Sequence, residues 1–194
     1  MGFVYASQAD VDFVLERRRQ AWAQKPQHIL REAGRFPYGE EFPAQVPRLI
    51  DQLADLLNLS RDELDYTWAS LEKVEKKIKH RGRQKSLAVP IFPALLAYVG
   101  EVMRHDVQGE WQMRRSRQDA EVWEPWIVDA REHEYNPFLP LYDALDEDSD
   151  YPTIQIVIAA TVEVSVKRVW LPPHKRKPGP FPISGDDPPP KMQK

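Results

Sequence analysis

The stretch AYVGEVMRHDVQGEW, residues 97–111, carries an apolar helical pattern into a segment that alternates like a strand. Gly109 is a typical residue to end the helix, and Trp111 stands where the strand begins. Gly100 lies inside the helical pattern, where glycine costs about 1 kcal/mol relative to alanine, so we expect a neighbouring helix or an aromatic ring to approach it closely. The stretch therefore predicts a helix-to-strand junction.

Helical signals fill the chain before this junction. Ser7 resembles an N-terminal cap for an apolar periodicity that ends at Pro26. Ser60 and Glu63 form an S-x-x-E capping box, and a basic run followed by Gly82 closes the helix that we expect after it. The predicted helices span residues 7–26, 44–58, 60–82 and 88–107.

After the junction the pattern changes to that of strands. Alternation and aromatic residues predict two short strands near 110–114 and 121–129, which would form a hairpin against the helices. A short helix is expected over about 137–145. The segment 153–167 alternates at period two and is rich in β-branched residues, which favours a strand, although its nearly continuous apolar run could equally be a buried helix.

These elements predict an α+β protein with a helix-rich N-terminal half packed on a small antiparallel β-ribbon. The length of 194 residues and the hydrophobic content of 42% fit a single domain, which we place at residues 1–170. Residues 171–194 are rich in proline and have no apolar periodicity, so we expect a disordered or extended basic tail.

The composition excludes several classes of protein. The chain has no cysteine, which rules out disulfides, thiolate nucleophiles and thiol-ligated metals. No segment has the length of a membrane span and the first residues do not resemble a secretory leader, so we expect a cytoplasmic protein with no membrane partner. The five histidines are scattered, and no Gly-rich phosphate loop is present, so no cofactor is predicted.

The charge argues against nucleic acid as a partner. The formal net charge is −3, and because the proline-rich tail is net basic, the remaining body is more acidic than that figure. An acidic body is a poor electrostatic footprint for binding phosphates. We interpret the basic run over residues 73–85 as complementing a helix dipole on a solvated face.

Three stretches in this order, LDYTWASLEKVEKKI, LLAYVGEVMRHDVQGEW and NPFLPLYDAL, resemble a widespread family of small bacterial proteins. Many members are encoded near polymorphic or contact-dependent toxins and are suspected to be immunity proteins. The resemblance covers roughly residues 60–145, and the β-branched segment and the proline-rich tail depart from the family pattern. It implies a structural signature at Ser70, Tyr98, Gly100, Glu101, Gly109, Trp111, Asn136 and Pro137. An immunity role follows only by analogy.

Glu101 and His105 raise an alternative of another class. Their spacing puts both side chains on one helical face, where they could hold a metal, and His133 could supply a further ligand. However, the sequence has no H-E-x-x-H motif and no second histidine near His105. A small metal-dependent enzyme using Glu101, His105 and His133 is therefore an alternative, and we expect Glu101 to accept hydrogen bonds at the junction instead.

Two features favour protein binding. Two tryptophans flank Pro125 and would face opposite sides of a regular strand, and an acidic cluster occupies a later loop. An acidic patch beside partly exposed tryptophans suits a small inhibitor that steers to a basic enzyme and caps it. The predicted partner-binding residues are Trp123, Trp126, Asp143, Asp146, Glu147, Asp148 and Asp150.

The sequence thus predicts a non-enzymatic module that binds another protein, as an immunity or antitoxin-like factor. An adaptor or subunit of a larger bacterial assembly, docking through the proline-rich tail, is a further alternative.

Overall fold

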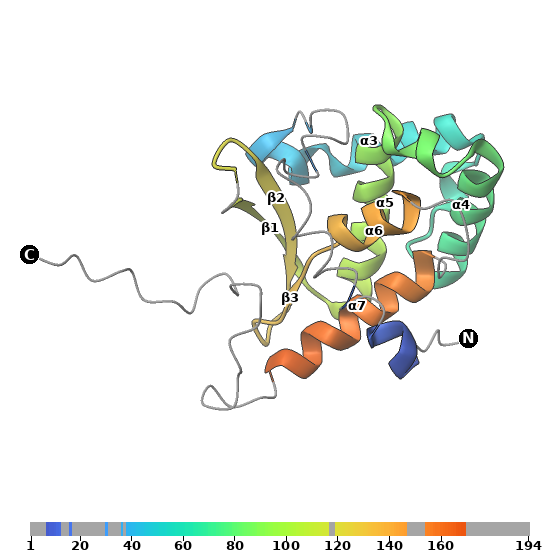
Figure 1. Cartoon of the computed structure of the whole chain (residues 1–194). Helices are drawn as coiled ribbons and strands as arrows, with labels where there is room; N and C mark the ends of the chain where they lie inside the picture. Colours follow the sequence, from blue (N-terminus) through green and yellow to red (C-terminus); the bar gives the residue numbers. More distant parts are fainter. Residues whose placement is uncertain are drawn as a thin grey trace, which may run out of the picture.

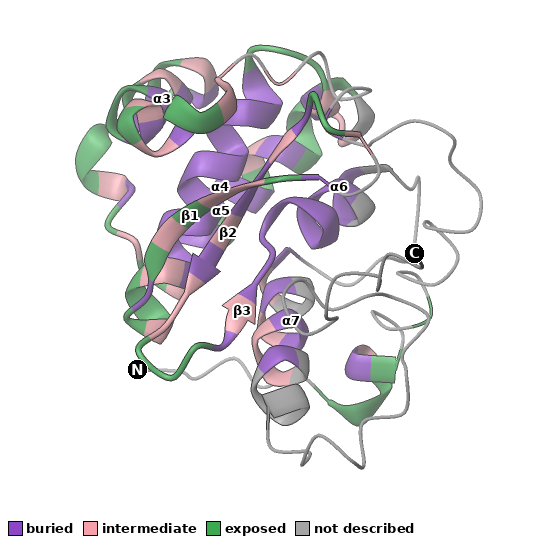
Figure 2. Cartoon of the chain, turned by 90° about the vertical axis from the view of Figure 1, so that its left-hand side faces the viewer, coloured by how far each residue is buried: buried purple, intermediate pink, exposed green. Residues whose placement is uncertain are grey.

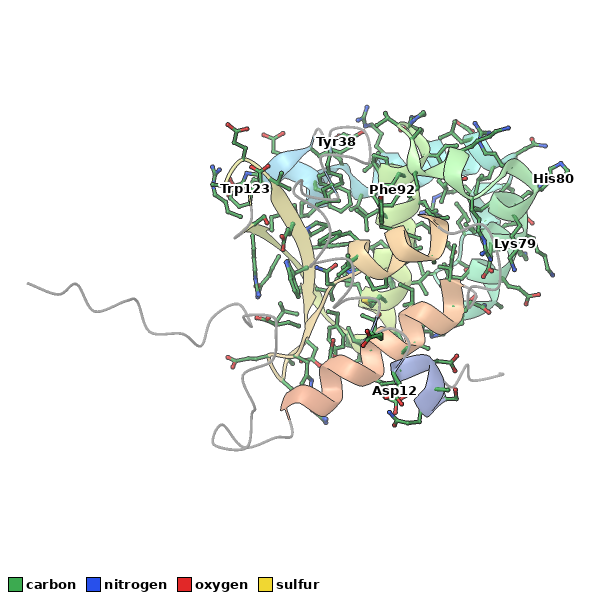
Figure 3. The ribbon with its side chains drawn as sticks, viewed as in Figure 1. Asp12, Tyr38, Lys79, His80, Phe92 and Trp123 are labelled. Atoms are coloured by element: carbon green, nitrogen blue, oxygen red, sulfur yellow. The ribbon has the colours of Figure 1, made fainter. Side chains whose placement is uncertain are left out.

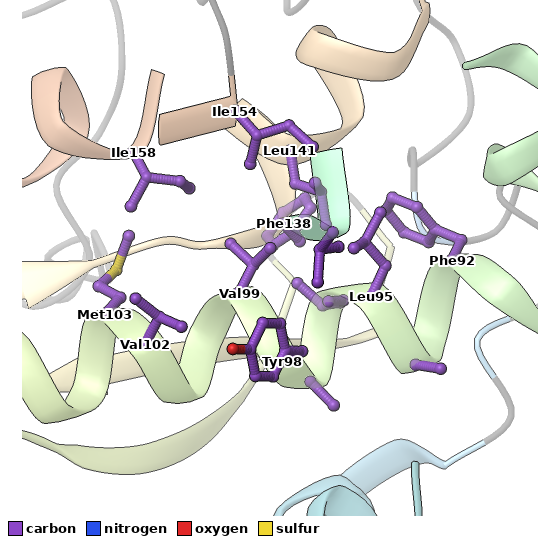
Figure 4. Close-up of a cluster of buried hydrophobic side chains, with 14 of the residues drawn as sticks. Phe92, Leu95, Tyr98, Val99, Val102, Met103, Phe138, Leu141, Ile154 and Ile158 are labelled. Atoms are coloured by element: carbon purple, nitrogen blue, oxygen red, sulfur yellow. The ribbon is translucent and has the colours of Figure 1, made fainter. Parts of the chain in front are cut away.

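The helix α5 (Ile91–Val107) runs through the centre of the structure, between the sheet and the other helices (Figure 1). Every residue from Ile91 to Met103 is buried, as expected for a helix that is apolar on all sides. Apolar side chains of α6 (Phe138–Asp146) and α7 (Ile154–Val169) lie over those of α5 (Figure 4). The predicted helix before the junction is therefore the centre of the hydrophobic core.

The computed structural model describes residues 7–12, 16, 30, 36, 38–116, 119–146 and 154–169. The predicted tail and most of the predicted first helix lie outside these residues. Ser7 caps a helical segment as predicted, since its Oγ accepts the Asp10 N–H at 3.2 Å. The helices between Tyr38 and α5 are η1 (Gly39–Glu41), α3 (Phe42–Leu57), η2 (Arg61–Glu63), α4 (Trp68–Arg81) and η3 (Gln84–Leu87).

The sheet confirms the predicted hairpin. Its three antiparallel strands lie in the order β1 (Glu110–Arg115), β2 (Trp123–Val128) and β3 (Glu134–Tyr135). The third strand was not predicted, because two residues are too few to show alternation. Together with the helices, the sheet gives the expected α+β fold.

Two prolines limit the pairing of β2 with β3. Ile127 pairs with Tyr135, and in the same register Pro125 would stand opposite Pro137. Neither proline has an N–H to donate, so the ladder cannot continue past Tyr135. The chain turns into α6 instead, where Asn136 Oδ1 accepts the N–H groups of the first two residues of the helix, both at 3.1 Å.

The segment 153–167 is helical, so of the two alternatives the buried helix is correct and the strand that the alternation favoured is wrong. In α7, Ile154, Ile158, Thr161 and Ser165 are buried, at helical spacing. The helix packs on α6, α4 and β3, and its first N–H, at Ile154, donates to the carboxylate of Glu75 at 3.1 Å. A run this rich in β-branched residues resembles a strand in its pattern, but its burial repeats at helical spacing.

The predicted helix over 60–82 begins later than expected. The capping box of Ser60 and Glu63 is present, but it caps the N-terminus of the short 3₁₀ helix η2 and not that of α4. Tyr66 then adopts a left-handed conformation with φ of 62°, and Thr67 caps α4 by accepting the Ser70 N–H at 3.2 Å. Among the described residues, no helix has both the length and the apolar character needed to span a bilayer.

Candidate functional site

The junction at Gly100 and Trp111 is closely packed. A Cβ atom on Gly100 would lie 2.0 Å from Cη2 of the Trp111 indole, so only glycine leaves room for this ring against α5. The ring also meets Phe42 of α3 edge to face, with centroids 5.4 Å apart. The expectation that an aromatic ring approaches Gly100 is confirmed.

Glu101 organises the polar side of the junction. It is only 8% exposed, and its Oε1 accepts the Trp111 indole N–H at 2.6 Å. Arg104 donates to both carboxylate oxygens at 2.9 Å, and these hydrogen bonds raise the pKa of its guanidinium. His105 Nε2 lies 3.6 Å from Oε2, at the exposed end of the cluster. Glu101 is therefore a hydrogen-bond acceptor, as we expected.

Tyr66 extends this cluster toward the loop before α4. Its ring stacks on His105 at 4.8 Å with an interplanar angle of 10°. The guanidinium of Arg61 lies 5.2 Å from the Tyr66 ring centre, bonds to its hydroxyl, and pairs with Asp51 at 3.0 Å. Arg61 and Arg104 were missed from the sequence, because single arginines in a charged chain carry no distinguishing pattern.

Ser70 and Tyr98 form the buried end of the same region. Their hydroxyl groups hydrogen-bond to each other, and the Ser70 hydroxyl also bonds to the carbonyl oxygen of Thr67 at 2.6 Å. Burial raises the pKa of the Tyr98 phenol.

Gly109 is needed on the sheet side, since a Cβ there would lie 2.7 Å from Ile127 and 2.9 Å from the Val128 carbonyl oxygen. Among the signature residues, Ser70 and Tyr98 thus meet between α4 and α5, Gly100 and Glu101 meet Trp111 between α5 and β1, and Gly109 packs on β2. Asn136 and Pro137 stand apart at the start of α6.

The predicted metal ligands do not form a common site. His133 is buried in the turn between β2 and β3, where its Nδ1 lies 2.7 Å from Asp129 Oδ2. The Tyr135 hydroxyl donates to the same oxygen at 2.9 Å. Within the described ranges, no group of three His, Asp or Glu residues is placed to hold a metal ion. Glu101, His105 and His133, the ligands of the metal-enzyme alternative, are therefore not brought together as a three-residue group among these residues.

Asp129 holds this turn together. Burial alone would raise its pKa, but hydrogen bonds from the side chain and backbone of His133, and from Tyr135, hold the pKa below the ordinary value. Burial and the neighbouring Asp129 carboxylate raise the pKa of Tyr135 far above its usual range. Sequence reasoning missed this group, although an Asp and a His four positions apart around a turn was a visible signal.

The two predicted tryptophans lie on opposite faces of β2, as alternation required. Trp123 is half-buried on the face toward the helices, near Gly39, and the Arg115 guanidinium stands 4.7 Å from its ring centre (Figure 3). Trp126 is half-buried on the outer face, where Arg114 stands 5.5 Å from its ring centre. Each face of the hairpin therefore carries one arginine–tryptophan pair.

The outer face holds further polar contacts. Trp126 donates its indole N–H to Glu124 at 3.1 Å, and Arg114 donates to Glu134 at 2.6 Å. Much of β1 and β2 on this side is half-buried or exposed (Figure 2).

The acidic cluster cannot be placed beside these tryptophans. Asp143 and Asp146 belong to α6, but their side chains are outside the described part of the structure, and so are Glu147, Asp148 and Asp150. The predicted acidic patch therefore stays a prediction.

The chain matches no family model, no curated protein and no solved structure. The resemblance to the toxin-associated bacterial family accordingly remains a prediction carried by the motifs alone.

Proposed function

We propose that this protein acts by binding another protein, and that the hairpin of β1 and β2 is the surface it uses. The observation that carries the proposal is the direction of the backbone N–H and C=O groups of β1. The Ser116 N–H donates to the Val122 carbonyl at 2.8 Å, which fixes the alternation of hydrogen-bonded pairs along the hairpin. By that alternation, the N–H and C=O groups of Trp111, Met113 and Arg115 point away from β2.

The position of Pro125 agrees with this assignment. It stands opposite Met113, in a pair that makes no hydrogen bond across the hairpin, so its missing N–H costs nothing on that side. β1 has β2 as its only neighbour in the described part of the sheet. Its outward backbone groups make no backbone hydrogen bond among the described residues, so a further strand can pair with them.

The side chains around this edge are of the kind that dominate protein interfaces. Tryptophan and arginine are enriched among residues that contribute most to binding, and the hairpin presents a pair of them on each face. The polar groups of the junction hydrogen-bond to one another, and those of the β2–β3 turn do the same within the turn. This supports a structural role for both clusters. An immunity or antitoxin-like role, in which the partner is a toxin that this protein occludes, is the form of the proposal that the motif resemblance supports.

The product of the neighbouring gene is the first partner to test, by co-expression and by calorimetric titration of the two purified proteins. Met113→Pro removes the outward N–H without removing a hydrogen bond to β2, and Met113→Leu is its matched control. We expect proline to weaken binding by about tenfold or more and leucine by less than about threefold.

Thermal unfolding followed by circular dichroism must show that both variants are folded. Trp126→Ala tests the side-chain contribution, with an expected loss of about thirtyfold if this residue is central to the interface. Full binding by folded Met113→Pro and Trp126→Ala would refute the hairpin as the binding surface.

A further inference from the structure

The basic run over residues 73–85 begins inside α4 and continues past its end. It divides into a part that is paired within the molecule and a part that is not. Its first lysines are paired within the molecule: Lys73 lies 3.6 Å from Glu63, Lys76 lies 2.8 Å from Glu72, and Lys79 lies 2.8 Å from Glu75. Two of these pairs join residues one helical turn apart, a common arrangement on solvated helices. These lysines therefore need no external partner.

The second part has no such compensation. His80, Arg81, Arg83 and Lys85 form no ion pair or side-chain hydrogen bond in the part of the chain that the structure describes, and all but the half-buried Arg83 are exposed. The sequence contains no Asp or Glu between Glu75 and Glu101, so nothing nearby along the chain balances them. We name these four residues the cationic corner.

The dipole of α4 accounts for only part of this charge. His80 and Arg81 lie in the last turn, where positive charge stabilises a helix by about 0.3–1 kcal/mol. Arg83 and Lys85 come after the helix has ended, beyond the range of that effect. Their accumulation beside the helix end brings repulsion that no ion pair among the described residues offsets.

The backbone of the cationic corner is held in a defined shape. Gly82 has a φ of 100°, and its N–H donates to the Ile78 carbonyl at 3.0 Å, which ends the helix. The buried Ser86 donates its hydroxyl to the Gly82 carbonyl at 3.1 Å, and its N–H donates to the Arg83 carbonyl at 2.9 Å. The charges are thus presented from an ordered turn, which lowers the entropic cost of binding.

An exposed apolar side chain follows the cationic corner in the sequence, after Ser86, Leu87 and Ala88. Val89, 48% exposed, is the large hydrophobic residue that the described structure leaves open to solvent. A phosphate backbone offers nothing to such a side chain, whereas a peptide segment supplies both carboxylates and apolar groups.

We infer that the cationic corner binds an acidic segment of a partner protein. This surface is separate from the hairpin: Lys79 and His80 lie at the opposite side of the molecule from Trp123 (Figure 3). The inference goes beyond the proposed function, and the two surfaces would allow the protein to bridge two partners or two parts of one partner.

The test uses the full chain and a labelled copolymer of glutamate and tyrosine, with binding followed by fluorescence anisotropy at about 50 mM and about 300 mM salt. The triple variant Arg81→Gln, Arg83→Gln and Lys85→Gln should weaken binding by about five- to fiftyfold, as expected from the loss of three exposed charge contacts. The matched control replaces Lys73, Lys76 and Lys79 by glutamine, which removes the same charge from the paired lysines, and should change binding by less than about threefold.

Three further arms complete the experiment. Val89→Ser should weaken binding of the copolymer but not of poly-glutamate, because only the copolymer has apolar groups. Met113→Pro, which changes the hairpin, should leave copolymer binding unchanged. The copolymer assay therefore tests the cationic corner independently of the hairpin proposal. Equal losses in the two triple variants, or tighter binding of a single-stranded oligonucleotide than of the copolymer at both salt concentrations, would overturn the inference, as would no binding of the copolymer at about 50 mM salt.

Discussion

Replacing Gly100 by alanine should destabilise the protein, although alanine is the better helix former. Inside a helix the exchange gains about 1 kcal/mol from backbone propensity. The added Cβ, however, would lie 2.0 Å and 2.5 Å from two atoms of the Trp111 ring, so the indole must move. Overpacking of this kind costs about 1–3 kcal/mol.

Moving the indole also disturbs its hydrogen bond to Glu101, now 2.6 Å, and a bond to a carboxylate contributes about 1.5–3 kcal/mol. The balance is a loss of about 2–4 kcal/mol in the free energy of unfolding. For a chain of this length that corresponds to a fall of about 5–15 °C in the melting temperature.

Urea unfolding followed by circular dichroism measures this loss. Trp111→Leu alone and the double variant Gly100→Ala with Trp111→Leu complete a double-mutant cycle. Because leucine leaves room for the new methyl group, we expect the double variant to be more stable than the sum of the single losses implies, by about 1–2 kcal/mol. If Gly100→Ala were neutral or stabilising, or if the two losses were additive, the close approach of Trp111 to α5 would be refuted as the reason for this glycine.

Glu101→Gln should lower the free energy of unfolding by about 1–3 kcal/mol in urea titrations, because it leaves the Arg104 guanidinium without its carboxylate; an unchanged midpoint would contradict this. Asp129→Asn should destabilise by about 1–2 kcal/mol at neutral pH. Since the pKa of Asp129 is lowered by folding, its stabilisation is present above about pH 4 and is lost as the pH falls through the folded value, so melting curves of the two proteins should converge in acid. A gap that stays constant from neutral to acidic pH would argue against the role of this carboxylate. Tyr98→Phe should cost about 1 kcal/mol in urea unfolding, because Ser70 keeps its bond to the backbone; a loss as large as that of Gly100→Ala would contradict this.

The helix-to-strand junction was predictable because each of its signals is local. Gly100 was anomalous in a helix and Trp111 stood eleven positions later in an alternating segment, so both pointed to close packing without knowledge of the fold. The role of Glu101 as a hydrogen-bond acceptor followed from the lack of other metal ligands in the sequence around it.

Other features depend on contacts that no local pattern encodes. Tyr66 reaches His105 because its backbone adopts a left-handed conformation, which tyrosine rarely does and which its neighbours do not predict. The sequence left residues 153–167 open between a strand, which propensity favoured, and a buried helix; packing against α4 and α6 goes with the helix α7. The sequence does not show which residues of the basic run are paired. The cationic corner could be recognised only after the structure showed ion pairs for the preceding lysines.

The two prolines at positions 125 and 137 have a consequence for how this protein can assemble. Pairing between β2 and β3 stops where they would face each other, and β3 has only two residues and contacts α7. In the described part of the sheet, β1 is therefore the edge along which a further strand can be added. A sheet that can grow at one edge only gives a closed complex with fixed stoichiometry, whereas a sheet with two long free edges is open to polymerisation. If β1 receives a partner strand as proposed, the two prolines would limit strand addition to that one edge and so disfavour fibre formation.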